Sequence, residues 1–204
     1  MLKPLWYALF GAFIVYLAGG CMGTPRVTDP ARTAVEQLLI STAADRALAQ
    51  VEFAKLEGKK VFLDSSGLTG ADTAYVNGIL SVLLGKHGAL IAGDRSEADM
   101  IAVINSGSFS IDRSDSFFGI PSIAIPIPLT GTFNTPEIGL FKTIKQTGVA
   151  KFVINVYEIP TGKQILAVGP VSGETFYNYH RMFFLFQYRK TDIPEKEKRR
   201  WSQP

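Results

Sequence analysis

Cysteine, histidine and net charge are all scarce in this sequence of 204 residues, which has one cysteine and two histidines. The single cysteine, Cys21, excludes a disulfide within the chain, and two histidines far apart, His87 and His180, make a poor metal site without cysteine partners. The 21 basic and 18 acidic residues give a formal net charge of +3, which indicates no nucleic-acid footprint. We therefore predict no metal, no cofactor and no nucleic-acid partner.

Signatures of catalysis are also lacking. The segment DSSGLTG, residues 64–70, precedes a predicted helix as phosphate-binding loops do, but no Lys-Ser or Lys-Thr pair follows its last glycine. Asp112 and Asp115 form a carboxylate pair in SIDRSDS, where a polar, serine-rich turn offers neither burial nor like charge to raise a pKa. We predict a helix-entry loop in the first case, a turn in the second, and no enzyme activity.

The beginning of the chain is typical of an export signal. Lys3 precedes the uncharged run LWYALFGAFIVYLAGG, whose apolar part is about 14 to 16 residues, shorter than the roughly 20 of a spanning helix. Residues 1–20 are therefore predicted to be a signal peptide. The following organisation is a tether at 21–32, a single α/β domain at 33–188 and a basic charged tail at 189–204.

The segment LAGGC resembles a bacterial lipobox, in which the cysteine carries a diacylglycerol after cleavage. This resemblance implies that Cys21 is a lipidation site, although Leu17 stands four residues before Cys21 where lipoboxes usually place leucine three before it. Met22 is not aspartate, which in the enterobacterial sorting rule implies the outer membrane. An ordinary signal peptide or an N-terminal anchor with an incidental cysteine is the alternative.

Hydrophobic periodicity predicts a two-layer α/β (α+β) sandwich, with one mixed sheet and helices on one face. Thr33 and Glu36 form a capping box at the start of a helix over 33–50, and a second helix is expected at 71–86. Strands are expected at 59–64, at 89–93 and within 97–113. A C-terminal antiparallel hairpin turns at PTGK, and Phe152, Ile154 and Val156 form one core-facing row in it.

An apolar, proline-rich insertion, FFGIPSIAIPIPLTGTF at 117–133, separates the third strand from the hairpin. Its three prolines exclude a helix and a central strand, so we predict an extended ribbon. The ribbon packs either within its own domain or against a neighbouring subunit or the membrane interface. We favour the second possibility, with a contact surface made of Phe117, Phe118, Ile120, Ile123, Ile125 and Ile127.

A second aromatic run, MFFLFQY, follows His180. If this run forms a strand, both of its faces carry apolar or aromatic side chains. The strand is therefore expected either to be buried on both faces or to present one face to a partner.

The EAD turn at 97–99, the apolar insertion and the hairpin AKFVINVYEIPTGKQILAVGPVSGETFY resemble the α/β domain of outer-membrane assembly lipoproteins. These include the curli secretion channel, a Pel polysaccharide lipoprotein and LpoB-type activators of peptidoglycan synthases. TDPARTAVEQLLISTAADRALAQ followed by GKKVFLD is similar to a family of uncharacterised bacterial lipoproteins. The curli channel has two long transmembrane hairpins per subunit, whereas the insertion here is too short to supply strands of about 9 to 11 residues twice over.

These resemblances imply a non-enzymatic, acyl-anchored envelope lipoprotein on the periplasmic face of the outer membrane. It is expected to be a structural or assembly component, such as an export or secretion scaffold, with the membrane and an envelope protein or further copies of itself as partners. The alternative is a monomeric lipoprotein activator that binds an envelope enzyme such as a peptidoglycan synthase.

The lipid anchor makes a direct prediction. Cys21→Ser removes the acylated thiol, so the variant is expected to be uncleaved or soluble and to leave the detergent phase, because each buried acyl methylene contributes about 0.8 kcal/mol to attachment. Palmitate labelling and detergent partition measure this. Full palmitate labelling of the Cys21→Ser variant would contradict the assignment.

Overall fold

The structure is a computed structural model, and it describes residues 32–53, 56–70, 72–127, 131–183 and 185–194. Cys21, the predicted signal peptide and all but the last residue of the predicted tether lie outside the described residues. The same is true of the last part of the predicted basic tail. The described residues belong to one compact unit that begins at Arg32.

Both predicted helices are present. Helix α2, Ala34–Leu48, begins at Thr33, whose side chain accepts a hydrogen bond from the Glu36 N–H while the Glu36 carboxylate accepts one from the Thr33 N–H. The predicted capping box is therefore confirmed. Helix α3, Thr73–Lys86, has His87 as its C-terminal capping residue. Its buried side consists of Val76, Leu80 and Leu84.

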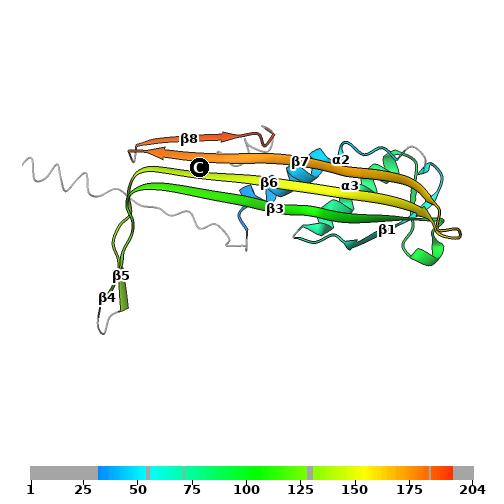
Figure 1. The fold of residues 1–204 in the computed structure, drawn as a ribbon, viewed down its shortest axis with the longest axis horizontal. Coiled ribbons are helices and arrows are strands. Elements are labelled where there is room, and N and C mark those ends of the chain that lie inside the picture. Colours follow the sequence, from blue (N-terminus) through cyan, green and yellow to red (C-terminus); the bar gives the residue numbers. More distant parts are fainter. Residues whose placement is uncertain (1–31, 54–55, 71, 128–130, 184, 195–204) are drawn as a thin grey trace, which may run out of the picture. The chain divides into compact units, whose positions relative to one another are not determined.

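The sheet has six strands in the order β2-β1-β3-β6-β7-β8. Strand β1 is parallel to β2 and β3, whereas all the other neighbours are antiparallel. Both helices pack on one face of this mixed sheet, as predicted (Figure 1). The strands are β1 (Lys60–Gly67), β2 (Leu90–Ile91), β3 (Met100–Ile120), β6 (Ile138–Glu158), β7 (Gln164–Met182) and β8 (Phe186–Thr191). A short 3-10 helix, Arg95–Glu97, precedes β3.

Strands β3 and β6 are 21 residues each, far longer than predicted. Their ladder runs from Met100 opposite Glu158 to Ile120 opposite Ile138. The turn predicted around Asp112 and Asp115 is therefore wrong, because both residues lie within β3. Serine and aspartate favour turns locally, but pairing with a distant strand satisfies the backbone of this segment instead.

The proline-rich insertion contains a small hairpin of its own. Strand β4, Ala124–Ile127, pairs with β5, Gly131–Asn134, in a separate two-stranded sheet. Pro126 is tolerated opposite Thr132 because both strands of such a sheet are edge strands. The predicted extended ribbon is thus partly a hairpin of two edge strands, and Phe117 to Ile120 are the end of β3. The hairpin within the insertion has strands of only four residues each, as expected of so short a segment, whereas the long strands β3 and β6 reach the insertion from either side.

The core lies between the helices and the sheet. The predicted row of Phe152, Ile154 and Val156 is confirmed, since all three side chains are fully buried. Small residues dominate where α2 meets the sheet, and on the sheet side they are Gly148, Ala150 and Gly173. The facing residues of α2 are Ala43, Ala44 and Ala47.

Two glycines allow the backbone of α2 to approach the sheet closely. A Cβ atom at Gly173 would lie 2.1 Å from the Ala43 carbonyl oxygen and 2.7 Å from the Ala47 nitrogen. A Cβ at Gly148 would lie 2.7 Å from the Leu39 carbonyl oxygen. Because these neighbours are backbone atoms, the helix itself would have to move to accept a side chain.

Gly173→Ala is expected to lower the free energy of unfolding by about 1 to 3 kcal/mol, because the added methyl displaces α2. Urea unfolding measures the change. Gly107→Ala is the matched control, since its nearest neighbour would be a Lys151 side-chain carbon at 3.6 Å, an ordinary contact distance. The control is expected to stay within about 0.5 kcal/mol of the parent. Equal stability of both variants would contradict the tight contact.

Candidate contact surface at the distal end of the sheet

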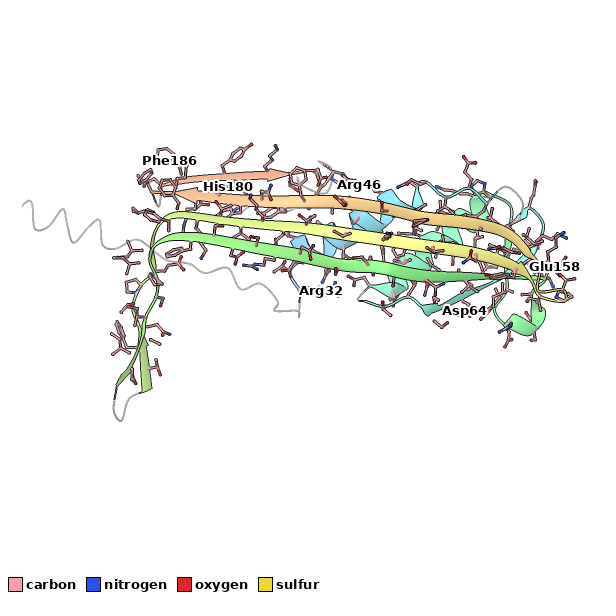
Figure 2. The ribbon with its side chains drawn as sticks, viewed as in Figure 1. Arg32, Arg46, Asp64, Glu158, His180 and Phe186 are labelled. Atoms are coloured by element: carbon pink, nitrogen blue, oxygen red, sulfur yellow. The ribbon has the colours of Figure 1, made fainter. Side chains whose placement is uncertain are left out.

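Four strands continue beyond the helices. Helix α2 begins beside Gln146, whose side-chain amide donates to the Glu36 carboxylate at 3.1 Å. Beyond this point no described helix covers β3, β6, β7 or β8, and Figure 2 shows His180 and Phe186 in this part. We call this part the distal sheet, and it comprises residues 112–120, 138–146, 177–182 and 186–191.

The register of the distal sheet brings apolar side chains into one row. Phe118 lies opposite Phe141, Phe141 opposite Met182, and Met182 opposite Phe186. The Phe141 ring contacts Phe118 and Phe183, with centroid distances of 6.4 and 5.0 Å. Phe118 is nevertheless 64% exposed and Phe186 65% exposed. These four residues, which we call the apolar row, face solvent at the end of the sheet.

Sequence reasoning had missed the contribution of β6 to this surface. Ile138, Leu140 and Phe141 are all exposed at the beginning of β6. The signal was present, because FFGI at 117–120 is followed on the other side of the prolines by IGLF at 138–141, nearly its mirror image. Gly119 pairs with Gly139 and Ile120 with Ile138, as the mirror order requires of an antiparallel hairpin.

The predicted contact residues are exposed, but they do not form one surface. Phe117, Phe118 and Ile120 belong to β3, and strand alternation places Phe117 on the opposite face from the other two. Ile123 and Ile125 are exposed near or on the separate β4–β5 hairpin. The side chain of Ile127 lies outside the described residues. Burial within the domain, the alternative for this segment, is therefore not found for the five described side chains.

The aromatic run after His180 is also exposed. Phe183 and Leu185 lie in the turn between β7 and β8, and Leu185 is 82% exposed. Tyr188 in β8 is exposed and stacks on His180, with ring centroids 6.3 Å apart. A terminal strand buried on both faces was thus wrong, and the other possibility, a face available to a partner, remains a prediction.

The two faces of the distal sheet differ in chemistry. On the face that continues the helix side, Glu137 binds Lys142 at 3.1 Å and Arg181 at 3.3 Å. Arg189 lies over the Tyr179 ring on the same face, 5.9 Å from its centroid. The apolar row lies on the other face, which we call the outer face, because adjacent residues of a strand point to opposite sides.

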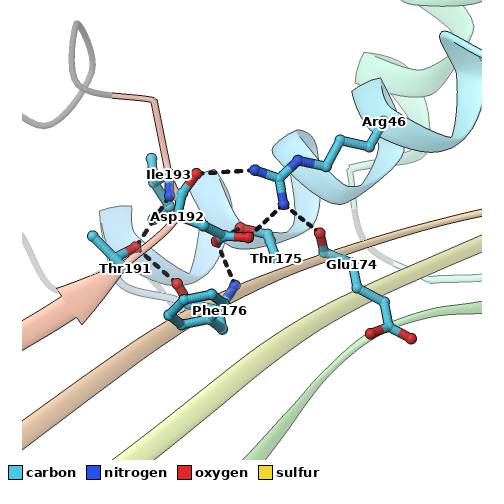
Figure 3. A network of polar contacts seen from close by, with 7 residues as sticks. All are labelled: Arg46, Glu174, Thr175, Phe176, Thr191, Asp192 and Ile193. Atoms are coloured by element: carbon cyan, nitrogen blue, oxygen red, sulfur yellow. Dashed lines mark hydrogen bonds and ion pairs between the residues drawn. The ribbon is translucent and has the colours of Figure 1, made fainter.

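A polar network fastens β8 to the helix layer (Figure 3). The Asp192 carboxylate accepts hydrogen bonds from the Thr175 hydroxyl and the Phe176 N–H, both at 2.7 Å. Arg46 of α2 forms an ion pair with the same carboxylate and donates to the Asp192 and Glu174 carbonyl oxygens. Residues after 188 were predicted to be a charged tail, whereas β8 continues to Thr191 and Ile193 is buried.

The network lowers the pKa of Asp192. Burial of the carboxylate opposes ionisation, but hydrogen bonds from the Phe176 N–H, Arg46 and Thr175 outweigh it, so the pKa lies below 3.8. Asp115 behaves similarly at the surface, since bonds from Arg113 at 2.9 to 3.2 Å lower its pKa. A lowered pKa does not suit general acid or base work near neutral pH.

The remaining sequence candidates lie apart from one another. His180 contacts the Thr143 hydroxyl at 3.1 Å on the sheet, whereas His87 lies at the end of α3 with its ring 6.2 Å from that of Phe53. Among the residues that the structure describes, no three His, Cys, Asp or Glu side chains gather as metal ligands would. In the same residues, no helix is long and apolar enough to span a membrane.

Comparison with protein families assigns the chain. A model of a family of unknown function, DUF6655, matches residues 18–186. The chain belongs to this family. No curated protein matches the sequence. The DUF6655 match covers the described helices, the sheet strands β1, β2, β3, β6 and β7, and the apolar row, and it ends at the first residue of β8.

The Asp192 network predicts a pH effect. Because the folded pKa is below the unfolded value of 3.8, this stabilisation is full above that value and is lost as the pH falls through the folded pKa. We therefore expect Asp192→Asn to lower the free energy of unfolding by about 1 to 2 kcal/mol at neutral pH, after allowance for partial solvent screening. The difference between variant and parent is expected to shrink below about pH 4.

Urea unfolding across pH measures this difference. Asp112→Asn is the matched control, because Asp112 is exposed on β3. A pH-independent difference between Asp192→Asn and the parent would contradict the charged network.

Proposed function

We propose that this DUF6655 protein is a lipid-anchored structural or assembly component of the cell envelope, held at the periplasmic face of the outer membrane through Cys21. We further propose that its copies associate through the distal sheet. The anchor is supported by the sequence alone. Association is supported by one observation: among the described strands, the distal sheet ends on each side in an edge that no further strand pairs with.

The two edge strands of the distal sheet are β3 and β8, and the register aligns their residues in the same rows across the sheet. Beyond Asn105, β3 pairs only with β6 among the described strands, and β8 pairs only with β7. An unpaired edge offers a line of backbone N–H and C=O groups to a further strand. The register places Ser116 of β3 in the row of Tyr188 of β8, through Thr143 and His180. Strands β3 and β8 run in opposite directions, so β8 of one copy would extend the antiparallel pattern beside β3 of the next.

The charges on the two edge strands favour pairing of β8 of one copy with β3 of another. Strand β8 carries Arg189 and Lys190, whereas the facing stretch of β3 carries Asp112 and Asp115 with a single cation, Arg113, which pairs with Asp115. Pairing of β8 with β8 would place like charges together, but pairing of β8 with β3 in matched rows places Arg189 beside Asp115. Contact between two different edges is heterologous, and such contacts generate rings or open chains. Edge charges would thus exclude the wrong partner while permitting the right one.

Cysteine cross-linking tests the register in the acylated protein, in mild detergent. Ser116→Cys combined with Tyr188→Cys places two thiols in one row, where opposite Cβ atoms lie about 4.5 to 5.5 Å apart. Oxidation is expected to give a ladder of covalent multimers, since a disulfide needs only a small further approach.

Ser116→Cys combined with Arg189→Cys is the matched control. Residues 188 and 189 point to opposite faces of β8, so this pair is expected to give no ladder. A monomeric mass by light scattering, without a ladder from either pair, would contradict association. That result would favour the alternative function, a monomeric activator of an envelope enzyme.

A further inference from the structure

On the outer face of the distal sheet, the chemistry of the side chains changes from row to row, starting at the end of the sheet farthest from the helices. The apolar row comes first, with Phe118, Phe141, Met182 and Phe186. Two residues further along each strand, the next row on the same face contains Ser116, Thr143, His180 and Tyr188. The third row contains Ser114, Lys145, Asn178 and Lys190. Apolar, aromatic-polar and cationic side chains thus follow one another.

The lysines of the third row are available to a ligand. Lys145 and Lys190 are both exposed, and neither forms an ion pair within the part of the chain that the structure describes. On the helix side, by contrast, Lys142 and Arg181 share Glu137, Arg113 pairs with Asp115, and Arg189 lies over the Tyr179 ring. Unpaired positive charge is therefore found on the same face as the apolar row.

The spacing of the rows corresponds to the depth zones of a membrane surface. Four residues separate the first row from the third, which is about 13 Å along a strand. Interfacial segments bury apolar side chains about 5 to 10 Å into the boundary between headgroups and acyl chains, with tyrosine near headgroup depth and lysine against anionic lipid. The apolar part spans only a few residues of each strand, far less than the roughly 30 Å of a hydrocarbon core.

We propose that the distal sheet docks, apolar row first and with its strands inclined to the membrane plane, onto a membrane surface that carries anionic headgroups. The apolar row enters the interface, Tyr188 and His180 lie at headgroup depth, and Lys145 and Lys190 contact the lipid phosphates. This contact does not depend on acylation of Cys21. It does not depend on association either, because edge pairing extends a sheet and leaves its outer face uncovered.

A fluorescent label at the apolar row tests the contact. In the full chain with Cys21→Ser, Met182→Cys carries the only thiol and is labelled with a nitrobenzoxadiazole dye. Vesicles of phosphatidylethanolamine and phosphatidylglycerol in equal parts are expected to shift the dye emission to the blue. Lipids with a nitroxide on the upper acyl chain are expected to quench it, because the dye lies below the headgroups.

Two controls separate this contact from other binding. A label at Ser172→Cys, an exposed position of β7 beside α2, is expected to remain in water. Lys145→Gln combined with Lys190→Gln is expected to remove the difference in response between anionic vesicles and vesicles of phosphatidylcholine alone.

Two outcomes would overturn the proposal. The first is a dye at residue 182 that stays in water while the chain sediments with the vesicles. The second is a blue shift that appears with rising protein concentration in the absence of vesicles, which would show that the apolar row packs against a second copy. Cross-linking between Ser116→Cys and Tyr188→Cys reports association separately, so failure of one proposal is distinguishable from failure of the other.

Discussion

The close contact between α2 and two glycines of the sheet determines the rest of the arrangement. Gly148 and Gly173 let the helix backbone lie directly on β6 and β7, which favours this position of α2 along the long strands. A side chain at either glycine would collide with backbone atoms, which cannot turn away as a flexible side chain can. Because α2 is fixed there and begins beside Gln146, the ends of four strands are left without a helix above them.

A second contact decides how wide the uncovered part is. Asp192 is held by Arg46 from the helix and by Thr175 and Phe176 from β7. This places the end of β8 at the end of the helix layer, and β8 then adds Tyr188 and Lys190 to the outer face. Without that fastening, the residues after the turn at Phe183 would have only one ladder to hold them. Contacts from the helix on one face of the sheet thus fix the position of β8, which contributes residues to the opposite, outer face.

The same strands therefore serve two environments. Over the helices, Ile154 of β6 packs in the core, whereas ten residues earlier Ile144 lies in the distal sheet beside Tyr179 and Arg189. Strand alternation then separates an ion-paired face from a face with an exposed apolar row. The proposed association uses the edges of this sheet and the proposed membrane contact uses its outer face, so the two can operate together.

The sequence alone determined the helix start at Thr33, the mixed sheet with helices on one face, and the core row of Phe152, Ile154 and Val156. These features depend on capping and periodicity, which are local. It also identified the exposed aromatic runs as unusual. It did not predict that Asp112 and Asp115 lie in a strand, because their local preference for a turn is overridden by pairing with Thr147 and Ile144 of β6, which are 35 and 29 residues away. The apolar row was likewise decided by tertiary structure, since only the register of four strands brings Phe118, Phe141, Met182 and Phe186 together, and only the position of α2 leaves them uncovered.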